Sequence, residues 1–306
     1  FCNGWVRADW FTCCRTFAHV VELLLKRGDK VLVIDNLATG RKVHLSDNND
    51  LEVIIGSIAN RELISQTMTE FCPDVIVHAA CSYKDPEDWF NDTLTNCVGA
   101  SVLINEARKH EVKRFIYFQT ALCYGLKPSE NPISLEYPRN PEGSSYAISK
   151  TANELYLELS GLDYVTFRLA NVIGPRNVAG PLPIFYQRLK ENKKCFVTKS
   201  RRDFVFVSDL AEIVLKACDG VGNGPYHFSS GKDISILELY QHVVNSMGIK
   251  DYPEPEIREI SSDDAYSILL DPSKTFDDFG QIIFTPIEKT VDKAIAYYRE
   301  HGTLGE

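Results

Sequence analysis

The stretch AHVVELLLKRGDKVLVIDNLATG, residues 18–40, decides the fold class of this chain. It joins a helical pattern to an apolar strand, Lys30 to Asp35, which ends in a carboxylate and a polar turn. A fully apolar strand next to a helix is typical of a parallel sheet that helices cover on both faces. The stretch therefore indicates one step of an alternating order of strands and helices.

The same alternation continues through the first half of the chain. Further strands are predicted at Leu51 to Ile55, Val75 to His78, Arg114 to Gln119 and Tyr164 to Leu169. Helices are predicted at Arg61 to Phe71, Asn96 to His110 and Ser145 to Leu159. This order predicts an α/β fold with a Rossmann-like, doubly wound parallel sheet.

The acidic end of the strand at residues 30–35 indicates the cofactor. In nucleotide-binding α/β units a carboxylate such as Asp35 accepts hydrogen bonds from the adenine-ribose hydroxyls, and it would repel the 2′-phosphate of NADP. NAD is therefore favoured. The competing interpretation is an ordinary turn formed by Asp35 and Asn36.

After Pro175 the pattern changes to shorter pieces punctuated by proline and glycine. Helices are predicted near Pro183 to Asn192, Asp209 to Ala217, Ile236 to Met247 and Val291 to Glu300, and a strand at Phe204 to Val207. We expect residues 1–175 to form an NAD-binding domain and residues 176–306 a smaller, mixed α/β substrate lobe, with segments that can interleave between the two.

Composition excludes several classes of protein. The chain has 306 residues, of which 44% are hydrophobic and 25% charged, as in soluble globular proteins. The formal charge of −9 argues against nucleic-acid binding. Nine cysteines with no Cys-x-x-Cys pair predict reduced, buried thiols, no metal site and a cytoplasmic location. No apolar run approaches the roughly 18 residues that span a bilayer, so no membrane partner is expected.

The glycine-rich phosphate loop of a dinucleotide-binding unit is missing. Residues 1–17 contain only Gly4, with Trp5 and Trp10 nearby, and a tryptophan does not fit against a pyrophosphate. Back-translation of Asn3 to Phe11, read from the second base of each codon, permits Thr-Gly-Gly-Cys-Gly-Leu-Ile-Gly. We hypothesise a frameshift, splice variant or gene-prediction error; the alternative is a chance match.

The segment SSYAISK carries a candidate catalytic pair. Tyr146 and Lys150 are four residues apart and share one face of a helix. A nearby ammonium group stabilises a phenolate, so Tyr146 is a candidate general base. Thr120 ends the apolar strand of FIYFQTALCYG, where a hydroxyl can hold a substrate hydroxyl; the alternative is a threonine that closes a buried strand.

Several segments occur along the chain in this order: DNLATG, VIVHAA, TNCVGA, FQTALCYG, YAISK, FRLANVIGPR, RDFVFVSDLA, YHFSSGKDISI and LDPSKT. Together they resemble the extended short-chain dehydrogenase/reductase family, specifically its nucleotide-sugar epimerases and dehydratases. The resemblance runs from about Val20 to the C-terminus. It implies that the catalytic residues are Thr120, Tyr146 and Lys150. It also implies that the cofactor is bound by Asp35, Asn36, His78, Ala79, Ala80, Lys84, Asn96, Tyr146 and Lys150.

In this resemblance the individual contacts have distinct roles. His78, Ala79 and Ala80 would form the loop over the pyrophosphate, Lys84 would lie near the diphosphate or the nicotinamide ribose, and Asn96 would support the central strand ends. Asn171 and Arg202 would contact the diphosphate of the nucleotide sugar, an anion that suits the arginine fork. The alternative for Arg202 is a surface ion pair with Asp203. One departure is Ser57, which stands where the family usually has an Asp that contacts adenine.

The reaction implied by the resemblance begins with oxidation at C4 of the sugar. Tyr146 would take the O4 proton, Lys150 would hold the nicotinamide ribose, and return of hydride to the other face of the 4-keto sugar would complete an epimerisation. Dehydratases and decarboxylases of the family need an acid/base pair after the threonine, whereas Ala121 and Leu122 follow here and cannot transfer protons.

We therefore expect a UDP-glucose 4-epimerase-like enzyme with NAD as cofactor and a UDP-sugar as substrate. One alternative is a nucleotide-sugar dehydratase or another NAD-dependent sugar modification. A second is an inactive binding protein that lacks the phosphate loop. The resemblance also implies a homodimer formed through the helices at residues 96–110 and 145–159. Leu122 stands where epimerase-reductases use a cysteine, and Cys123 is expected in the core.

Overall fold

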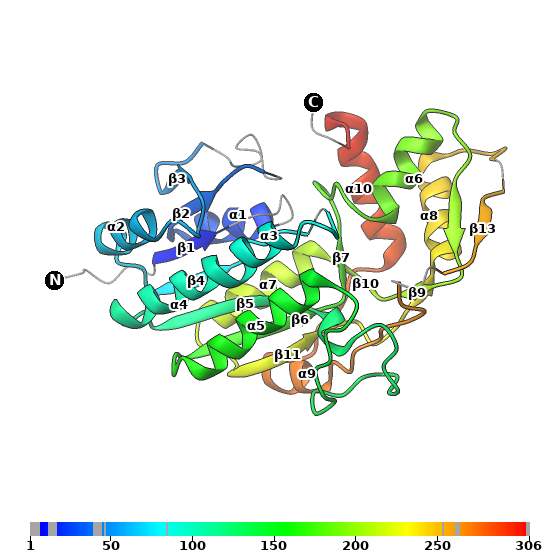
Figure 1. The fold of residues 1–306 in the computed structure, drawn as a ribbon. Helices are drawn as coiled ribbons and strands as arrows, with labels where there is room; N and C mark the ends of the chain where they lie inside the picture. Colours follow the sequence, from blue (N-terminus) through cyan, green and yellow to red (C-terminus); the bar gives the residue numbers. More distant parts are fainter. Residues whose placement is uncertain are drawn as a thin grey trace.

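The computed structural model of this chain describes residues 7–11, 17–38, 45, 47–83, 85–252, 254–260 and 264–303. Its main element is a parallel sheet with strand order β11-β6-β5-β4-β1-β2-β3 (Figure 1). The strands are β1 (Arg7–Phe11), β2 (Lys30–Asp35), β3 (Leu51–Ile55), β4 (Val75–His78), β5 (Arg114–Thr120), β6 (Tyr164–Leu169) and β11 (Gly224–Phe228). The order reverses between β1 and β4, as in a doubly wound sheet, so the predicted fold class is confirmed.

The register of the sheet aligns the carboxyl ends of its strands. Phe11 of β1 lies opposite Ile34 of β2 and His78 of β4, and His78 lies opposite Tyr117 of β5. β5 continues to Thr120. Open parallel sheets bind ligands beyond these carboxyl ends, because the loops that leave the strands diverge there.

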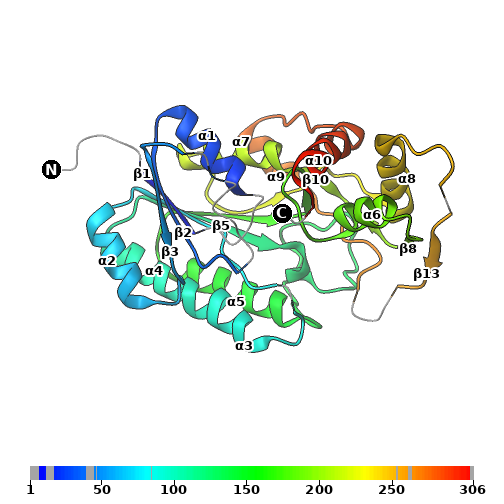
Figure 2. The same cartoon turned by 90° about the horizontal axis from the view of Figure 1, so that it is seen from above.

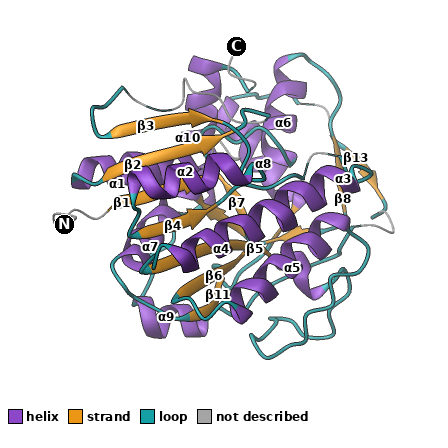
Figure 3. Cartoon of the chain, turned by 60° about the vertical axis from the view of Figure 1, so that its left-hand side comes forward, coloured by secondary structure: helices purple, strands orange, loops and turns teal. Residues whose placement is uncertain are grey.

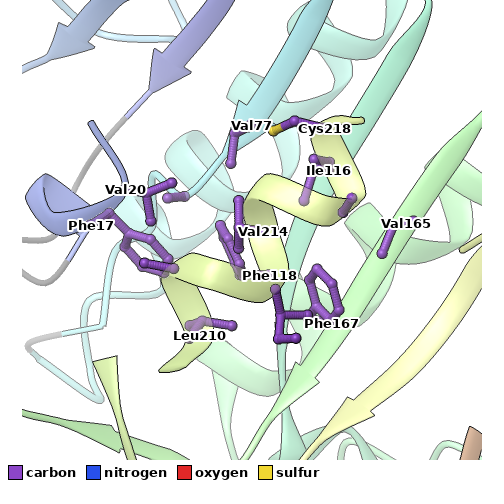
Figure 4. Packing of buried hydrophobic residues seen from close by; sticks show 14 of the residues in the cluster. Phe17, Val20, Val77, Ile116, Phe118, Val165, Phe167, Leu210, Val214 and Cys218 are labelled. Atoms are coloured by element: carbon purple, nitrogen blue, oxygen red, sulfur yellow. The ribbon is translucent and has the colours of Figure 1, made fainter. Parts of the chain in front are cut away.

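Helices cover both faces of the sheet (Figure 2). One face carries α1 (Ala18–Arg27) and α7 (Val207–Cys218), and the other carries α2 (Arg61–Phe71), α4 (Ala100–Lys109) and α5 (Ser145–Leu159). On the first face, Ile116 of β5 packs with Val214 of α7 in an apolar cluster (Figure 4). On the second, Tyr117 packs with Leu103 of α4. Neighbouring residues of β5 thus serve opposite layers of the core.

The helix predicted at Asn96 to His110 differs from the observed one. The helical segment begins earlier, with α3 (Trp89–Asp92), and passes through a π-helical turn at Thr93–Gly99 before α4. The Asp88 side chain caps α3 by accepting a hydrogen bond from Asn91 N. A π-helical turn inside a helix is frequent at functional sites, and this one contains Asn96.

The second half of the chain builds a smaller lobe beside the sheet (Figure 1). Its helices α6 (Pro181–Lys190), α8 (Ile236–Met247) and α10 (Ile287–His301) pack around one apolar cluster. Short strand pairs complete it: β7 (Asn171–Ile173) with β10 (Phe204–Phe206), β8 (Phe196–Thr198) with β13 (Glu256–Arg258), and β9 (Arg201–Arg202) with β12 (Ile234–Ser235). The chain also returns to the large sheet, where α9 (Ser273–Phe279) packs on β11.

The cysteines within the described residues are free thiols. Cys123, Cys195 and Cys218 are buried, and burial raises the pKa of Cys218 to about 12, so this thiol is unreactive. The expectation of buried thiols is wrong for Cys72, which is exposed because it lies just beyond the last turn of α2. Within the described segments, no helix combines the length and the apolar character needed to cross a membrane.

Candidate active site

A cavity of about 240 Å³ lies at the carboxyl ends of β2, β3 and β4. Asp35 lines it and is 7% exposed, and its Oδ1 accepts a hydrogen bond of 2.7 Å from Leu37 N. Asn36, Ser57 and Ala80 line it too. A carboxylate beside an open, partly apolar cavity can accept hydrogen bonds from ribose hydroxyls, so these residues fit the adenosine half of a dinucleotide.

The segment after β4 contains most of the other cofactor residues suggested by the sequence. His78 ends β4, is completely buried and stacks on Tyr117, with ring centroids 5.4 Å apart. Burial, followed by the nearby Lys150 ammonium, holds the pKa of His78 well below its usual value, so the ring is neutral. Ala79 and Ala80 follow it in the core, while Lys84 lies outside the described residues.

Asn96 links this segment to the helix of the candidate catalytic pair. Its Oδ1 accepts a 2.9 Å hydrogen bond from Ser82 N, and its Nδ2 donates to Ser82 O at 3.1 Å and to Ser149 Oγ at 3.0 Å. Asn96 is fully buried, and these contacts satisfy both ends of its amide. It therefore fixes the loop after β4 against α5, between Tyr146 and Lys150 in sequence.

Thr120, Tyr146 and Lys150 come from two elements that pack together, β5 and α5. Ser144 caps α5 by accepting a hydrogen bond from Ala147 N, which places Tyr146 in the first turn. Thr120 Oγ1 accepts a hydrogen bond of 3.2 Å from Leu122 N and so caps the short helical turn that follows β5. Tyr146 and Lys150 are one turn apart on α5, and both lie near Tyr117 of β5.

Tyr117 of β5 holds Lys150 in two ways. Its hydroxyl donates a 2.9 Å hydrogen bond to Lys150 O, and Lys150 Nζ lies 4.3 Å from the centre of its ring. Burial, followed by the proximity of Tyr146, keeps the pKa of Tyr117 well above its usual value, so its hydroxyl remains a donor. Lys150 is 2% exposed, and the aromatic face stabilises its buried charge.

A second cavity, of about 280 Å³, contains both predicted diphosphate-binding residues, Asn171 and Arg202. Arg202 donates a hydrogen bond of 2.5 Å to Asp264 Oδ1. The alternative pairing of Arg202 with Asp203 is wrong, because Asp203 is fully buried and accepts hydrogen bonds from Ser229 and Ser230 instead. The aromatic rings of Phe196 and Phe204 also line this cavity.

Sequence reasoning missed the buried polar side chains behind the candidate catalytic set. They are Tyr117, Gln119, Glu154 and Arg168, and each makes a hydrogen bond to another buried residue near α5. Two signals were available: a glutamine inside the apolar strand FIYFQT, and a glutamate four residues after Lys150 on the same helical face. Among the described residues, no three His, Cys, Asp or Glu side chains are grouped to hold a metal ion.

Known proteins resemble the chain over nearly its whole length. A profile of the NAD-dependent epimerase/dehydratase family matches residues 18–229. The Bordetella bronchiseptica enzyme WbmH, solved in complex with NAD+, is 61% identical and superposes with a TM-score of 0.94, covering 98% of this chain and 100% of that one. WbmG of the same organism, solved with NAD and UDP, is 38% identical and superposes with a TM-score of 0.91, covering 97% of this chain and 95% of that one. UDP-glucose 4-epimerase of Mycolicibacterium smegmatis is 29% identical over 92% and 94% of the two chains.

Proposed function

Because the chain belongs to the NAD-dependent epimerase/dehydratase family, we propose that it epimerises a nucleotide sugar, with a UDP-sugar as substrate, through a 4-keto intermediate. One observation supports the proposal: β5, which ends at Thr120, packs on α5, which carries Tyr146 and Lys150, and Ala121 and Leu122 follow the threonine. The similar enzymes bind NAD and UDP or carry the name UDP-glucose 4-epimerase, which supports this choice of cofactor and substrate.

Each residue of the set has a defined role. Bound NAD supplies a reversible acceptor for the hydrogen at C4 of the sugar. Tyr146 takes the O4 proton as general base and returns it, and the Lys150 ammonium stabilises the phenolate form of Tyr146. The Thr120 hydroxyl hydrogen-bonds the reacting sugar hydroxyl and holds it against Tyr146. These are the groups that a proton transfer at O4 needs.

A dehydratase is supported less well. Elimination of water across C5 and C6 requires an acid and a base near those carbons, and the family places them directly after the threonine. Here Ala121 is apolar, and Leu122 packs with the buried Cys123 and Tyr124. Neither side chain transfers protons, so the 4-keto sugar is left to accept hydrogen again at C4.

The remaining contacts divide between the two halves of the chain. In residues 1–175, Asp35 and Asn36 bind the adenine ribose, while His78, Ala79, Ala80, Lys84 and Asn96 shape the site of the pyrophosphate and nicotinamide ribose. In residues 176–306 together with Asn171, the second cavity receives the sugar nucleotide, and Arg202 shares its fork between Asp264 and the diphosphate. The free thiols of the described residues support a cytoplasmic location.

A second copy of this chain is the partner that we propose. Figure 3 shows the continuous helical run of α3 and α4 lying beside α5 over one face of the sheet. Large apolar side chains on this layer are exposed: Trp89, Phe90, Val98, Ile148, Leu155, Tyr156 and Leu159. Residues 148, 155 and 159 form one helical stripe, which a partner helix would cover. Light scattering should give twice the chain mass, and Leu159→Glu, at 84% exposure, should give the single-chain mass.

The first experiment measures the cofactor and then the reaction. The purified chain is denatured, and the supernatant is assayed for NAD by absorbance and mass. We expect near-stoichiometric NAD, followed by C4 inversion of at least one UDP-sugar in a proton NMR screen. Tyr146→Phe should keep its NAD and lose at least about 100-fold in kcat, because it lacks the general base.

The absence of a glycine-rich segment in residues 1–17 favours a second candidate, an inactive binding protein. It predicts no NAD in the supernatant and no inversion, with UDP-sugar binding retained. Restoring the glycine segment of the shifted reading frame should then restore NAD binding. Release of water with a keto product, in place of C4 inversion, would instead identify a dehydratase.

A further inference from the structure

Gln119 is a buried amide next to the last residue of β5. It is 2% exposed, its Oε1 accepts a 2.8 Å hydrogen bond from Thr120 N, and its Nε2 donates a 3.1 Å hydrogen bond to Glu154 Oε2 on α5. Only this orientation of the amide satisfies both partners, because a backbone N–H needs an acceptor and a carboxylate needs a donor. One side chain therefore joins the main chain of Thr120 to α5.

Glu154 is an anchor that cannot shift easily. It is fully buried, and its Oε1 lies 3.0 Å from both Nε and Nη2 of Arg168 on β6. Arg139 Nη1 lies 3.4 Å from its other oxygen. Breaking a buried pair of opposite charges leaves an uncompensated charge in the core, which is strongly destabilising. Gln119 is thus hydrogen-bonded to a fixed carboxylate.

The anchor lies on the helix of the proposed catalytic pair. Tyr146, Lys150 and Glu154 follow one another at intervals of four residues along α5, so they share one face. The Gln119 bridge sets the position of Thr120 relative to that face. Thr120 has its own side chain fixed by the hydrogen bond from Leu122 N, so a shift of its main chain would move its hydroxyl with it.

We propose that Gln119 is a positioning residue, which acts through Glu154 to hold Thr120 in register with Tyr146 and Lys150. The inference rests on the proposed function, because it takes the roles of these three residues from there. Misplacing a reacting group by about 1 Å can cost about 100-fold in rate. A glutamine that only satisfied buried hydrogen bonds would instead affect stability.

Two substitutions at one position separate these roles. Gln119→Leu keeps the volume and removes both hydrogen bonds, so kcat should fall about 10- to 100-fold at every pH, with KM changed less than threefold and NAD content unchanged. In Gln119→Glu, the new carboxyl can donate to Glu154 and accept from Thr120 N only while the pair holds one proton. Its kcat relative to the unmodified enzyme should therefore be highest at low pH and fall as pH rises.

Tyr226→Phe is the matched control. The Tyr226 hydroxyl donates a hydrogen bond of 2.5 Å to Asp278 of α9, and β6 separates its strand from β5. The substitution therefore also removes a buried polar group from the sheet, at a distance from Thr120. It should lower the melting temperature and leave kcat within twofold. The proposal is overturned if Gln119→Leu behaves like this control, or if Gln119→Glu is no more active than Gln119→Leu at any pH.

Amide hydrogen exchange tests the bridge without a substrate. Thr120 N–H should exchange at least about 10-fold faster in Gln119→Leu than in the unmodified protein, and should not change in Tyr226→Phe. If the unmodified protein inverts no UDP-sugar, the proposed function fails while the exchange rate still decides the bridge. Unchanged exchange at Thr120 in Gln119→Leu would overturn the inference whatever the activity.

Discussion

The two faces of β5 are built from neighbouring residues, but one makes apolar contacts and the other makes hydrogen bonds. On the face toward α1 and α7, Ile116 and Phe118 lie in an apolar cluster (Figure 4). On the face toward α5, Tyr117 and Gln119 make hydrogen bonds to Lys150 O and Glu154. Apolar packing is undirected and tolerates changes that keep volume, whereas a buried polar network depends on every partner.

The polar face extends far beyond β5. Arg168 bonds Glu154 and also donates to Tyr124 Oη, so the Tyr124 hydroxyl donates its hydrogen to His227 Nε2, 2.6 Å away. His227 Nδ1 then donates to Asp271 O at 2.9 Å. The network thus connects α5 with β11 and with the segment leading into α9. The apolar face contributes stability, and we propose that the polar face also orients the reacting groups.

The largest effect is expected on the apolar face. Ile116→Ala should lower the free energy of unfolding by about 2–5 kcal/mol, because the fully buried side chain leaves a cavity between β5 and α7. Denaturant titration measures this loss. The kcat of the folded, NAD-loaded fraction should stay within twofold. Ile116→Val, which removes one methylene, should cost about 0.5–1.5 kcal/mol; a large fall in kcat with either variant would break the distinction between the faces.

The polar network should make the free energy of unfolding depend on pH, whereas the apolar face of β5 should not. Burial lowers the pKa of His227 to about 4, against about 6.5 in the unfolded chain. Above pH 6.5 His227 is neutral in both the folded and the unfolded state, and its contribution to the free energy of unfolding is complete. Between pH 6.5 and pH 4 only the unfolded state binds a proton at His227, so the free energy of unfolding falls by about 3 kcal/mol. His227→Gln should remove that part of the slope in thermal or denaturant unfolding.

The comparison is made between the two proteins, because His19 and His78 also have lowered pKa values and keep titrating in the variant. For the Ile116→Ala protein, the difference from the unmodified chain should not change between pH 7 and pH 4. An equal slope in His227→Gln and in the unmodified chain would mean that His227 is not held neutral in the fold.

Much of the sheet was predictable because periodicity is local. The strands at residues 30–35, 51–55, 75–78 and 164–169 were predicted with their observed bounds, since buried parallel strands are continuous apolar runs between turns. The π-helical turn at Thr93–Gly99 was not, because its amino acids differ little from those of an α-helix. The start of the helix at Trp89 depends on the cap by Asp88, which the spacing of apolar residues does not reveal.

The site was predictable where residues repeat at helical spacing and not where distant segments meet. Tyr146 and Lys150 could be proposed as a pair from the sequence because they lie one turn apart on one helix. Gln119 and Glu154 are separated by 35 positions, and their hydrogen bond follows from the packing of α5 on β5. The ion pair of Arg202 with Asp264 was not foreseen, and only Asp203 was weighed as an alternative partner, because Asp264 comes from a distant part of the chain.

The smallest effect, and the sharpest test of the comparison, is at Tyr117, the immediate neighbour of Ile116. Tyr117→Phe keeps the ring beneath the Lys150 ammonium and removes the hydrogen bond to Lys150 O, a bond of a kind that contributes about 0.5–1.5 kcal/mol. If that bond places Lys150, kcat should fall up to about 10-fold with KM unchanged, although the volume lost is smaller than in Ile116→Ala. Steady-state kinetics on NAD-loaded protein measures it. If Tyr117→Phe lost only stability and kept its kcat, the α5 face of β5 would be a packing surface like the other one, and the orientation of Lys150 would have to come from α5 alone.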